Sequence, residues 1–123
     1  GGLAALLATP GLVIAETYPG EIYGHLGLAI AGRTRSKRRQ GDRAADAPLL
    51  AAAAQRLGID LADGFAATLA AGFGGDTRGE DRFDAAVGLV GMVNILRGHC
   101  APGDPQDRER CSVEGWILGQ AEP

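Results

Sequence analysis

The feature that most constrains the fold is a long segment near the C-terminal end that is apolar on nearly every side. A helix is predicted over Arg78–Arg97, and from Ala85 to Leu96 each residue is apolar or small except Asn94. A helix without a polar face is buried in the centre of a domain, so the remaining elements have to pack around it. A capping box predicts its start, with Thr77 as the cap and the Glu80 side chain returning to the Thr77 amide.

The other predicted elements are short, and only two of them are strands. Apolar spacing and proline or glycine boundaries predict helices over Leu3–Ala8, over Gly20–Leu26 with Pro19 as first residue, over Leu49–Leu57 after a break or kink at Pro48, and through Leu61, Phe65 and Leu69. The predicted strands are Leu12–Ala15, as a strand buried on both faces, and Ser112–Leu118. Two strands alone are marginal in water, so the chain is either mostly helical or part of a sheet completed by segments outside it.

Length and composition exclude several classes of protein. The 123 residues, 46% of them hydrophobic, suit one domain and exclude a wholly disordered chain. No apolar run reaches the roughly 18–20 residues of a membrane span, and residues 1–8 do not have the pattern of a signal peptide. Cys100 and Cys111 are the only cysteines, which excludes a disulfide-dense secreted scaffold; they could bridge, although free thiols are expected inside a cell. We therefore expect a soluble, cytoplasmic domain with no membrane partner.

The charge of the chain is distributed unevenly. Residues 33–43, here called the basic segment, hold six basic residues and one acid in a chain of net charge −3. Such a run can bind the phosphates of a nucleic acid, and it can equally be a solvated surface loop. The segment contains no aromatic residue, which weakens a case for base stacking within it. The candidate substrate-binding residues are Arg35, Lys37, Arg38, Arg39 and Arg43.

Three carboxylates occupy positions where metal ligands are often found. Glu16 follows the first predicted strand, at the edge where open α/β sheets gather ligands. Asp81 and Asp84 lie one turn apart near the start of the central helix and so share one side of it. Clustered carboxylates suit Mg²⁺ or Mn²⁺, and two such ions can clamp the attacking and leaving oxygens of a phosphodiester. The simpler interpretation is a turn residue and two acids that complement the helix dipole.

An ordered set of motifs from Leu12 to Gly119 resembles one protein family. The motifs are Glu16-Thr17-Tyr18-Pro19, Ser36-Lys37-Arg38-Arg39-Gln40, Gly79-Glu80-Asp81-Arg82-Phe83-Asp84-Ala85-Ala86 and Glu114-Gly115-Trp116-Ile117-Leu118-Gly119. Together they resemble the family catalogued as domain of unknown function 429, predicted nucleases of the ribonuclease H-like fold. The start of the central helix is also similar to the last catalytic helix of Holliday-junction resolvases.

The resemblance implies a fold, an activity and a set of site residues. It implies that residues 1–123 are one domain, the helix-rich C-terminal portion of an α/β ribonuclease H-like fold, because the opening hairpin sheet of that fold and its first aspartate have no counterpart here. It also implies a metal-dependent nuclease using Mg²⁺ or Mn²⁺, with Glu16, Asp81 and Asp84 as catalytic metal ligands in an incomplete site. The alternative is a non-catalytic module that binds nucleic acid or protein. An open sheet edge would also let two copies of the chain pair.

Overall fold

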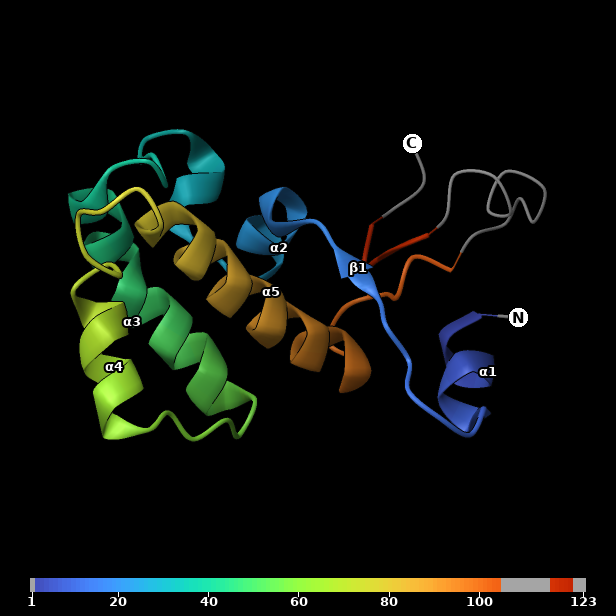
Figure 1. The fold of residues 1–123 in the computed structure, drawn as a ribbon. Helices are drawn as coiled ribbons and strands as arrows, with labels where there is room; N and C mark the ends of the chain where they lie inside the picture. The colour runs from blue at the N-terminus through green and yellow to red at the C-terminus, as the bar shows by residue number, and fades with distance from the viewer. Residues whose placement is uncertain (1, 105–115, 121–123) are drawn as a thin grey trace.

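The computed structural model describes residues 2–104 and 116–120. Within these residues the fold is mixed α/β and rich in helix, with five α-helices and two short strands (Figure 1). In chain order the elements are α1 (Gly2–Ala8), β1 (Glu16–Thr17), α2 (Pro19–His25), the 3₁₀-helix η1 (Ala29–Gly32), α3 (Gln40–Arg56), α4 (Asp63–Ala70), α5 (Gly79–Leu96) and β2 (Ile117–Leu118). No helix in the described ranges is long and apolar enough to cross a membrane.

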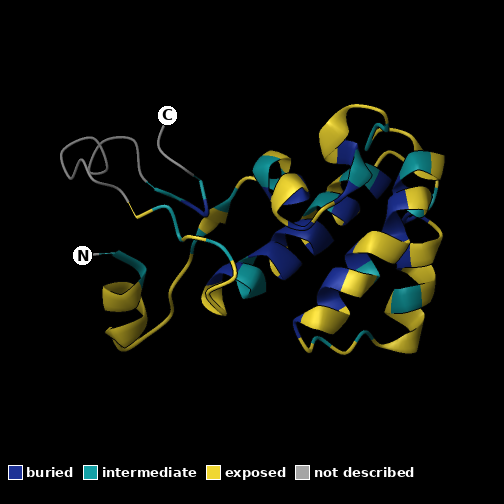
Figure 2. Cartoon of the chain, turned by 180° about the vertical axis from the view of Figure 1, so that it is seen from behind, coloured by how far each residue is buried: buried dark blue, intermediate teal, exposed yellow. Residues whose placement is uncertain are grey.

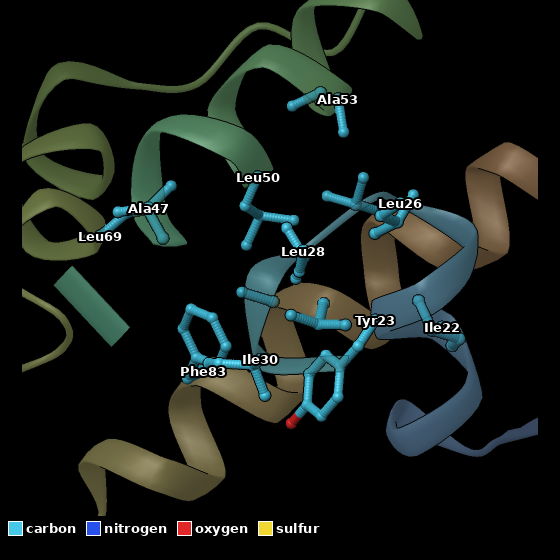
Figure 3. Packing of buried hydrophobic residues seen from close by; sticks show 14 of the residues in the cluster. Ile22, Tyr23, Leu26, Leu28, Ile30, Ala47, Leu50, Ala53, Leu69 and Phe83 are labelled. Atoms are coloured by element: carbon cyan, nitrogen blue, oxygen red, sulfur yellow. The ribbon is translucent and has the colours of Figure 1, made fainter. Parts of the chain in front are cut away.

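Helix α5 runs through the middle of the helical part, with α2 packed on one side and α3 on another (Figure 1). Its predicted range is confirmed within one residue at each end. Phe83 and Val87 of α5 are fully buried, and they meet Ile22 of α2 and Leu50 of α3 in one hydrophobic cluster (Figure 3). A Cβ on Gly91 would lie 2.5 Å from an Ile22 methyl, so this glycine lets α2 approach α5 closely.

Two details of the predicted helices are wrong. The capping box does not form, because Arg78 precedes α5 in an αR conformation and no side chain caps the helix, which leaves Glu80 free for another partner. Helix α3 is not broken at Pro48 but continues through it. Since Pro48 lies on the exposed side of α3, its ring contacts solvent rather than the core. The prediction of Pro19 as the first residue of a helix is confirmed by α2.

The central helix is not covered on every side. Leu89 and Leu96 of α5 are exposed, whereas Ala86, Val87 and Val90 are buried (Figure 2). The prediction of burial all round is therefore wrong for one face of α5. The physical reason is that, within the described residues, α2 and α3 are the helices that pack extensively on α5, and their contacts leave this face open.

The N-terminal part of the chain differs most from its prediction. The apolar segment Leu12–Ala15 forms no strand; Leu12 is 88% and Ile14 87% exposed, and α1 has no buried residue (Figure 2). Strand pairing is limited to β1 and β2, which run parallel with Glu16 opposite Ile117. The prediction of a strand buried on both faces is wrong, because a sheet of two such short strands has no layers to cover it. Of the predicted strand Ser112–Leu118, residues 112–115 lie outside the described residues.

Candidate functional site: a lysine-bridged carboxylate pair beside a basic cavity

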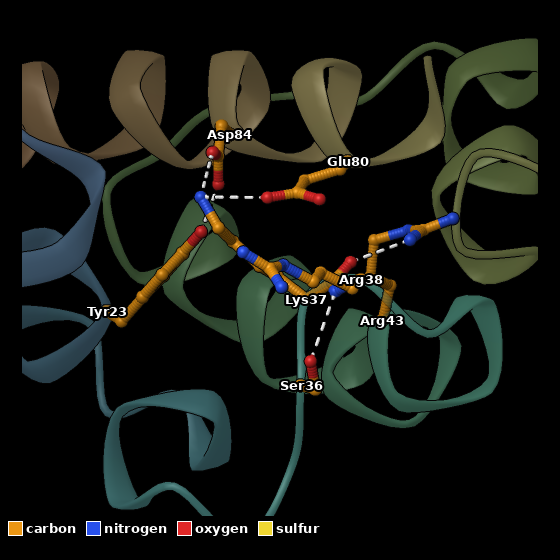
Figure 4. Close-up of polar contacts among 7 residues, drawn as sticks. All are labelled: Tyr23, Ser36, Lys37, Arg38, Arg43, Glu80 and Asp84. Carbon is orange, nitrogen blue, oxygen red and sulfur yellow. Dashed lines mark hydrogen bonds and ion pairs between the residues drawn. The ribbon is translucent and has the colours of Figure 1, made fainter. Parts of the chain in front are cut away.

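Among the predicted metal ligands, Asp84 is the one that the structure joins to other side chains within the described residues. It lies in the second turn of α5, and its two oxygens have different partners (Figure 4). The Tyr23 hydroxyl donates a hydrogen bond to Oδ1, and the Lys37 ammonium donates one to Oδ2 with an Nζ–O distance of 2.6 Å. The three side chains come from α2, the basic segment and α5, so the tertiary fold brings together residues that are far apart in sequence.

Glu80 joins the same cluster, although the sequence had assigned it to helix capping. Its Oε1 lies 3.2 Å from Lys37 Nζ, so two carboxylates one helical turn apart converge on one ammonium (Figure 4). We call Tyr23, Lys37, Glu80 and Asp84 the Lys37 cluster. The spacing of four residues between Glu80 and Asp84 could have identified this pair from the sequence. No sequence pattern identified Tyr23, whose partner is 61 residues away.

The Lys37 cluster shifts the protonation of two of its members. Burial raises the pKa of the Tyr23 phenol far above its usual value of 10.0, and the hydrogen bond and negative charge of Asp84, together with the charge of Glu80, raise it further. Burial lowers the pKa of Lys37, but hydrogen bonds and attraction to Asp84 and Glu80 outweigh this effect and raise it above 10.5. At neutral pH the cluster therefore holds a neutral phenol and a charged ammonium.

Glu16 and Asp81 lie outside the Lys37 cluster. Both are exposed, Glu16 on β1 and Asp81 in the first turn of α5. It is Thr17, the neighbour of Glu16, whose Oγ1 lies against α5, 3.1 Å from the position of a Cβ on Gly88. Across residues 2–104 and 116–120, no group of three or more His, Cys, Asp or Glu side chains could hold a metal ion. The three predicted ligands are thus not brought together, and their role as metal ligands stays a prediction.

The two carboxylates of the Lys37 cluster are the type of ligand that hard cations prefer. Asp84 and Glu80 direct one carboxylate oxygen each to the point where the Lys37 ammonium lies. Oxygen is the ligand that Mg²⁺ and Mn²⁺ prefer, and Mg²⁺ commonly binds one or two protein carboxylates and retains several waters. Asp84 and Glu80 are therefore the residues of the cluster that could supply part of the ligands of such an ion, which would then take the place of the Lys37 ammonium.

The basic segment is held in place by acidic side chains of α3. Asp46 is fully buried, and it accepts hydrogen bonds from the Ile30 amide at 2.8 Å and from the Arg35 guanidinium. One turn earlier, Asp42 Oδ2 accepts the Ser36 amide at 2.8 Å. The backbone and side chains of the segment are therefore fixed at successive residues. These contacts favour an ordered surface over the alternative of a solvated loop.

Arg43 has a structural role that corrects its prediction as a substrate-binding residue. It is only 2% exposed, and its guanidinium donates to three backbone carbonyls, those of Lys37 at 2.6 Å, Gly74 at 2.7 Å and Gly72 at 2.8 Å. A buried guanidinium with these partners cannot contact a substrate in this conformation. Arg43 instead joins the basic segment to residues 72–78, the glycine-rich loop that precedes α5.

An open cavity of about 420 Å³ lies between α2 and the basic segment. Its lining includes four cationic residues, Arg33, Arg35, Lys37 and Arg38. Tyr23 also lines the cavity, and its hydroxyl donates a hydrogen bond to Asp84. Within the described residues, Arg33 and Arg38 form no ion pair, so their charges face solvent at the cavity. The predicted binding residues Arg35, Lys37 and Arg38 are thus brought together. Arg39 does not line this cavity and pairs with Asp42 at 3.2 Å.

Cys100 lies near a histidine rather than near the basic cavity. Its Sγ is 3.4 Å from His25 Nδ1, and Cys111, with which a bridge was considered, lies outside the described residues.

Comparison with known proteins adds no family assignment. No family model, no curated protein sequence and no solved structure matches this chain.

Proposed function

We propose that this chain is part of a metal-dependent nuclease of the ribonuclease H-like class, which hydrolyses phosphodiester bonds of nucleic acid. The observation that carries the proposal is that the Asp84–Glu80 pair and the arginine-lined cavity share Lys37. A phosphate bound in the cavity would thus lie beside two carboxylates of the kind that hold divalent ions. The motif resemblance from Leu12 to Gly119 supports the same class.

Each part of the site has a physical task in this proposal. Arg33 and Arg38 bind the phosphate backbone by charge, and Arg35, fixed by Asp46, gives a guanidinium of defined orientation. Asp84, with Glu80, would hold Mg²⁺ or Mn²⁺, which supplies an activated water and stabilises the leaving oxygen. Tyr23 donates to Asp84 and keeps its carboxylate turned toward the cavity side.

The ligands of a complete ribonuclease H-like site extend beyond this pair. By resemblance Glu16 and Asp81 would contribute, together with an aspartate from the opening strand of that fold, for which this sequence has no counterpart. The proposal therefore assigns to this chain the last catalytic helix and the substrate-holding surface.

The proposal is tested by cleavage of a fluorescent oligonucleotide with Mn²⁺ and with a chelator, using the native protein and two variants. Asp84→Asn keeps the shape of the side chain but removes a charged ligand, and we expect it to lower the cleavage rate at least about a hundredfold. Asp60→Asn, at an exposed position remote from the cluster in sequence, is the matched control and should cleave as the native protein does. Equal cleavage by Asp84→Asn would remove Asp84 from the mechanism.

A second candidate function is a module that binds nucleic acid without cleaving it. It is favoured by the ammonium of Lys37 between the two carboxylates and by the positions of Glu16 and Asp81 outside the cluster. Salt-dependent binding of oligonucleotides by the complete protein that contains this chain, with no Mn²⁺-dependent cleavage, would select this function over the first.

A further inference from the structure

An aromatic residue that the proposed function has not used lies next to a residue that lines the cavity. Tyr18 precedes α2, and the residue is 53% exposed. A Cβ on Gly20 would lie 3.0 Å from two carbons of the Tyr18 ring, so the ring lies against Gly20. Gly20 itself lines the basic cavity together with Arg33, Arg35 and Arg38. The exposed Tyr18 ring thus contacts a residue in the wall of the basic cavity.

Tyr18 has no structural task comparable to that of Tyr23. Tyr23 is buried in the core, contacts Phe83 and bonds to Asp84. The Tyr18 hydroxyl, in contrast, makes no hydrogen bond to any residue in the described part of the chain. Half of the Tyr18 side chain is therefore available to a ligand that can cover an aromatic ring.

We propose that Tyr18 stacks a nucleobase while the arginines of the cavity bind the adjacent phosphates, which makes single-stranded nucleic acid the preferred ligand. This inference rests on the proposed function for the phosphate contacts. Aromatic stacking together with a cationic groove is the usual physical basis of single-strand binding, because every base has a face to stack. In a duplex the bases are already stacked on each other, so an exposed tyrosine ring contributes much less binding free energy.

The absence of a side chain at position 20 belongs to the same arrangement. Gly20 leaves room for the ring beside the first turn of α2, and a methyl group there would displace the ring by contact with its carbons at 3.0 Å. Gly20 is in the first turn of α2 and alanine favours helix more than glycine does, so Gly20→Ala changes the ring position without weakening the helix.

The experiment measures equilibrium binding by fluorescence anisotropy in the presence of a chelator, so that binding is separated from cleavage. The probes are a labelled oligothymidylate, an abasic oligonucleotide of the same length and a duplex. We expect Tyr18→Ala to weaken oligothymidylate binding about tenfold, with little change for the abasic probe. Tyr18→Phe should bind within about twofold of the native chain, and Gly20→Ala should fall between the two.

Each outcome assigns the result to one hypothesis. Duplex binding as tight as oligothymidylate binding, or an equal loss of affinity for base-bearing and abasic probes in Tyr18→Ala, would overturn the stacking inference. If the affinity is also unchanged in Arg38→Ala and does not depend on salt, the phosphate contacts of the proposed function are overturned as well. Thermal unfolding of Tyr18→Ala and Gly20→Ala checks that both variants fold.

Discussion

The basic segment and the apolar segment Leu12–Ala15 show opposite relations between composition and burial. The basic segment consists mainly of charged and polar residues, yet Arg43 in it is buried, and the fully buried Asp46 of α3 pairs with Arg35, whose side chain is 35% exposed. The apolar segment has no charge, yet Leu12 and Ile14 are almost fully exposed. The two regions lie on either side of α2 in the sequence.

The difference shows that burial in this chain follows from available partners rather than from side-chain type. Charged groups become buried where α3 and the glycine-rich loop offer carboxylates and carbonyls in the right places. Apolar groups stay exposed where β1 and β2 offer no layer to cover them. Substitutions in the two regions should therefore differ in their cost to stability.

Removal of the Arg43 guanidinium should have the largest effect on stability. In Arg43→Met three backbone carbonyls lose their donors inside the protein, so the free energy of unfolding should fall by about 3–5 kcal/mol. Urea denaturation followed by circular dichroism measures it. Arg39→Met is the matched control, since the Arg39 side chain is 73% exposed, and it should change stability by less than about 0.5 kcal/mol. Equal losses in the two variants would contradict the contrast between them.

Neutralising Asp46 should have a smaller effect. Asp46→Asn keeps the shape and one acceptor oxygen for the Ile30 amide but removes the charge opposite Arg35, so we expect a loss of about 1–3 kcal/mol. Phosphate-containing ligands should also bind more weakly, because Arg35 loses its fixed orientation. Asp60→Asn serves as the exposed control for stability. An unchanged unfolding midpoint in Asp46→Asn would show that the buried pair does not hold the segment.

The Lys37 cluster should make stability depend on alkaline pH. Tyr23 and Lys37 both have pKa values raised in the folded state, so the folded chain keeps protons that the unfolded chain releases above about pH 10. Their contribution is complete below that pH and is lost as the pH rises through the folded pKa values. The free energy of unfolding should therefore decline less steeply above pH 10 in Tyr23→Phe than in the native chain. Identical slopes would argue against a raised pKa of the Tyr23 phenol in the folded chain.

The smallest effect is expected in the apolar segment. Leu12→Gln should change the free energy of unfolding by less than about 0.5 kcal/mol, because the side chain is already in solvent. Leu50→Ala, at a fully buried position of α3, should cost about 2–5 kcal/mol under the same conditions. A large cost for Leu12→Gln would mean that a partner covers this segment in solution.

The sequence predicted the helices better than the contacts between them. Pro19 marked the start of α2, and the apolar run from Ala85 located α5 because helix periodicity is a local property of the chain. The exposure of Leu12 was not predictable, since burial of a strand depends on neighbours that the pattern does not contain. The charge run predicts that Arg43 binds substrate, because an arginine in such a run is usually solvated. Its three carbonyl partners lie in two different loops, and no local sequence pattern reveals them.

The same limit applies to the candidate site. Asp84 was identified from its place near the start of a buried helix, but its partners Tyr23 and Lys37 are 61 and 47 residues away in the chain. Only packing brings them into contact. Local reasoning predicts that Glu80 caps its own helix, and in the structure its partner is instead the distant Lys37.

The bonds of Arg43 have a consequence for how this surface can change over time or by engineering. One guanidinium fixes both the loop that carries Lys37 and the loop that leads into the helix of Glu80 and Asp84. Arg43 therefore links the cationic half of the site to its acidic half. The outer arginines can be exchanged one at a time to build a new specificity. A transfer of either half to another scaffold would also have to include Arg43 and its carbonyl partners.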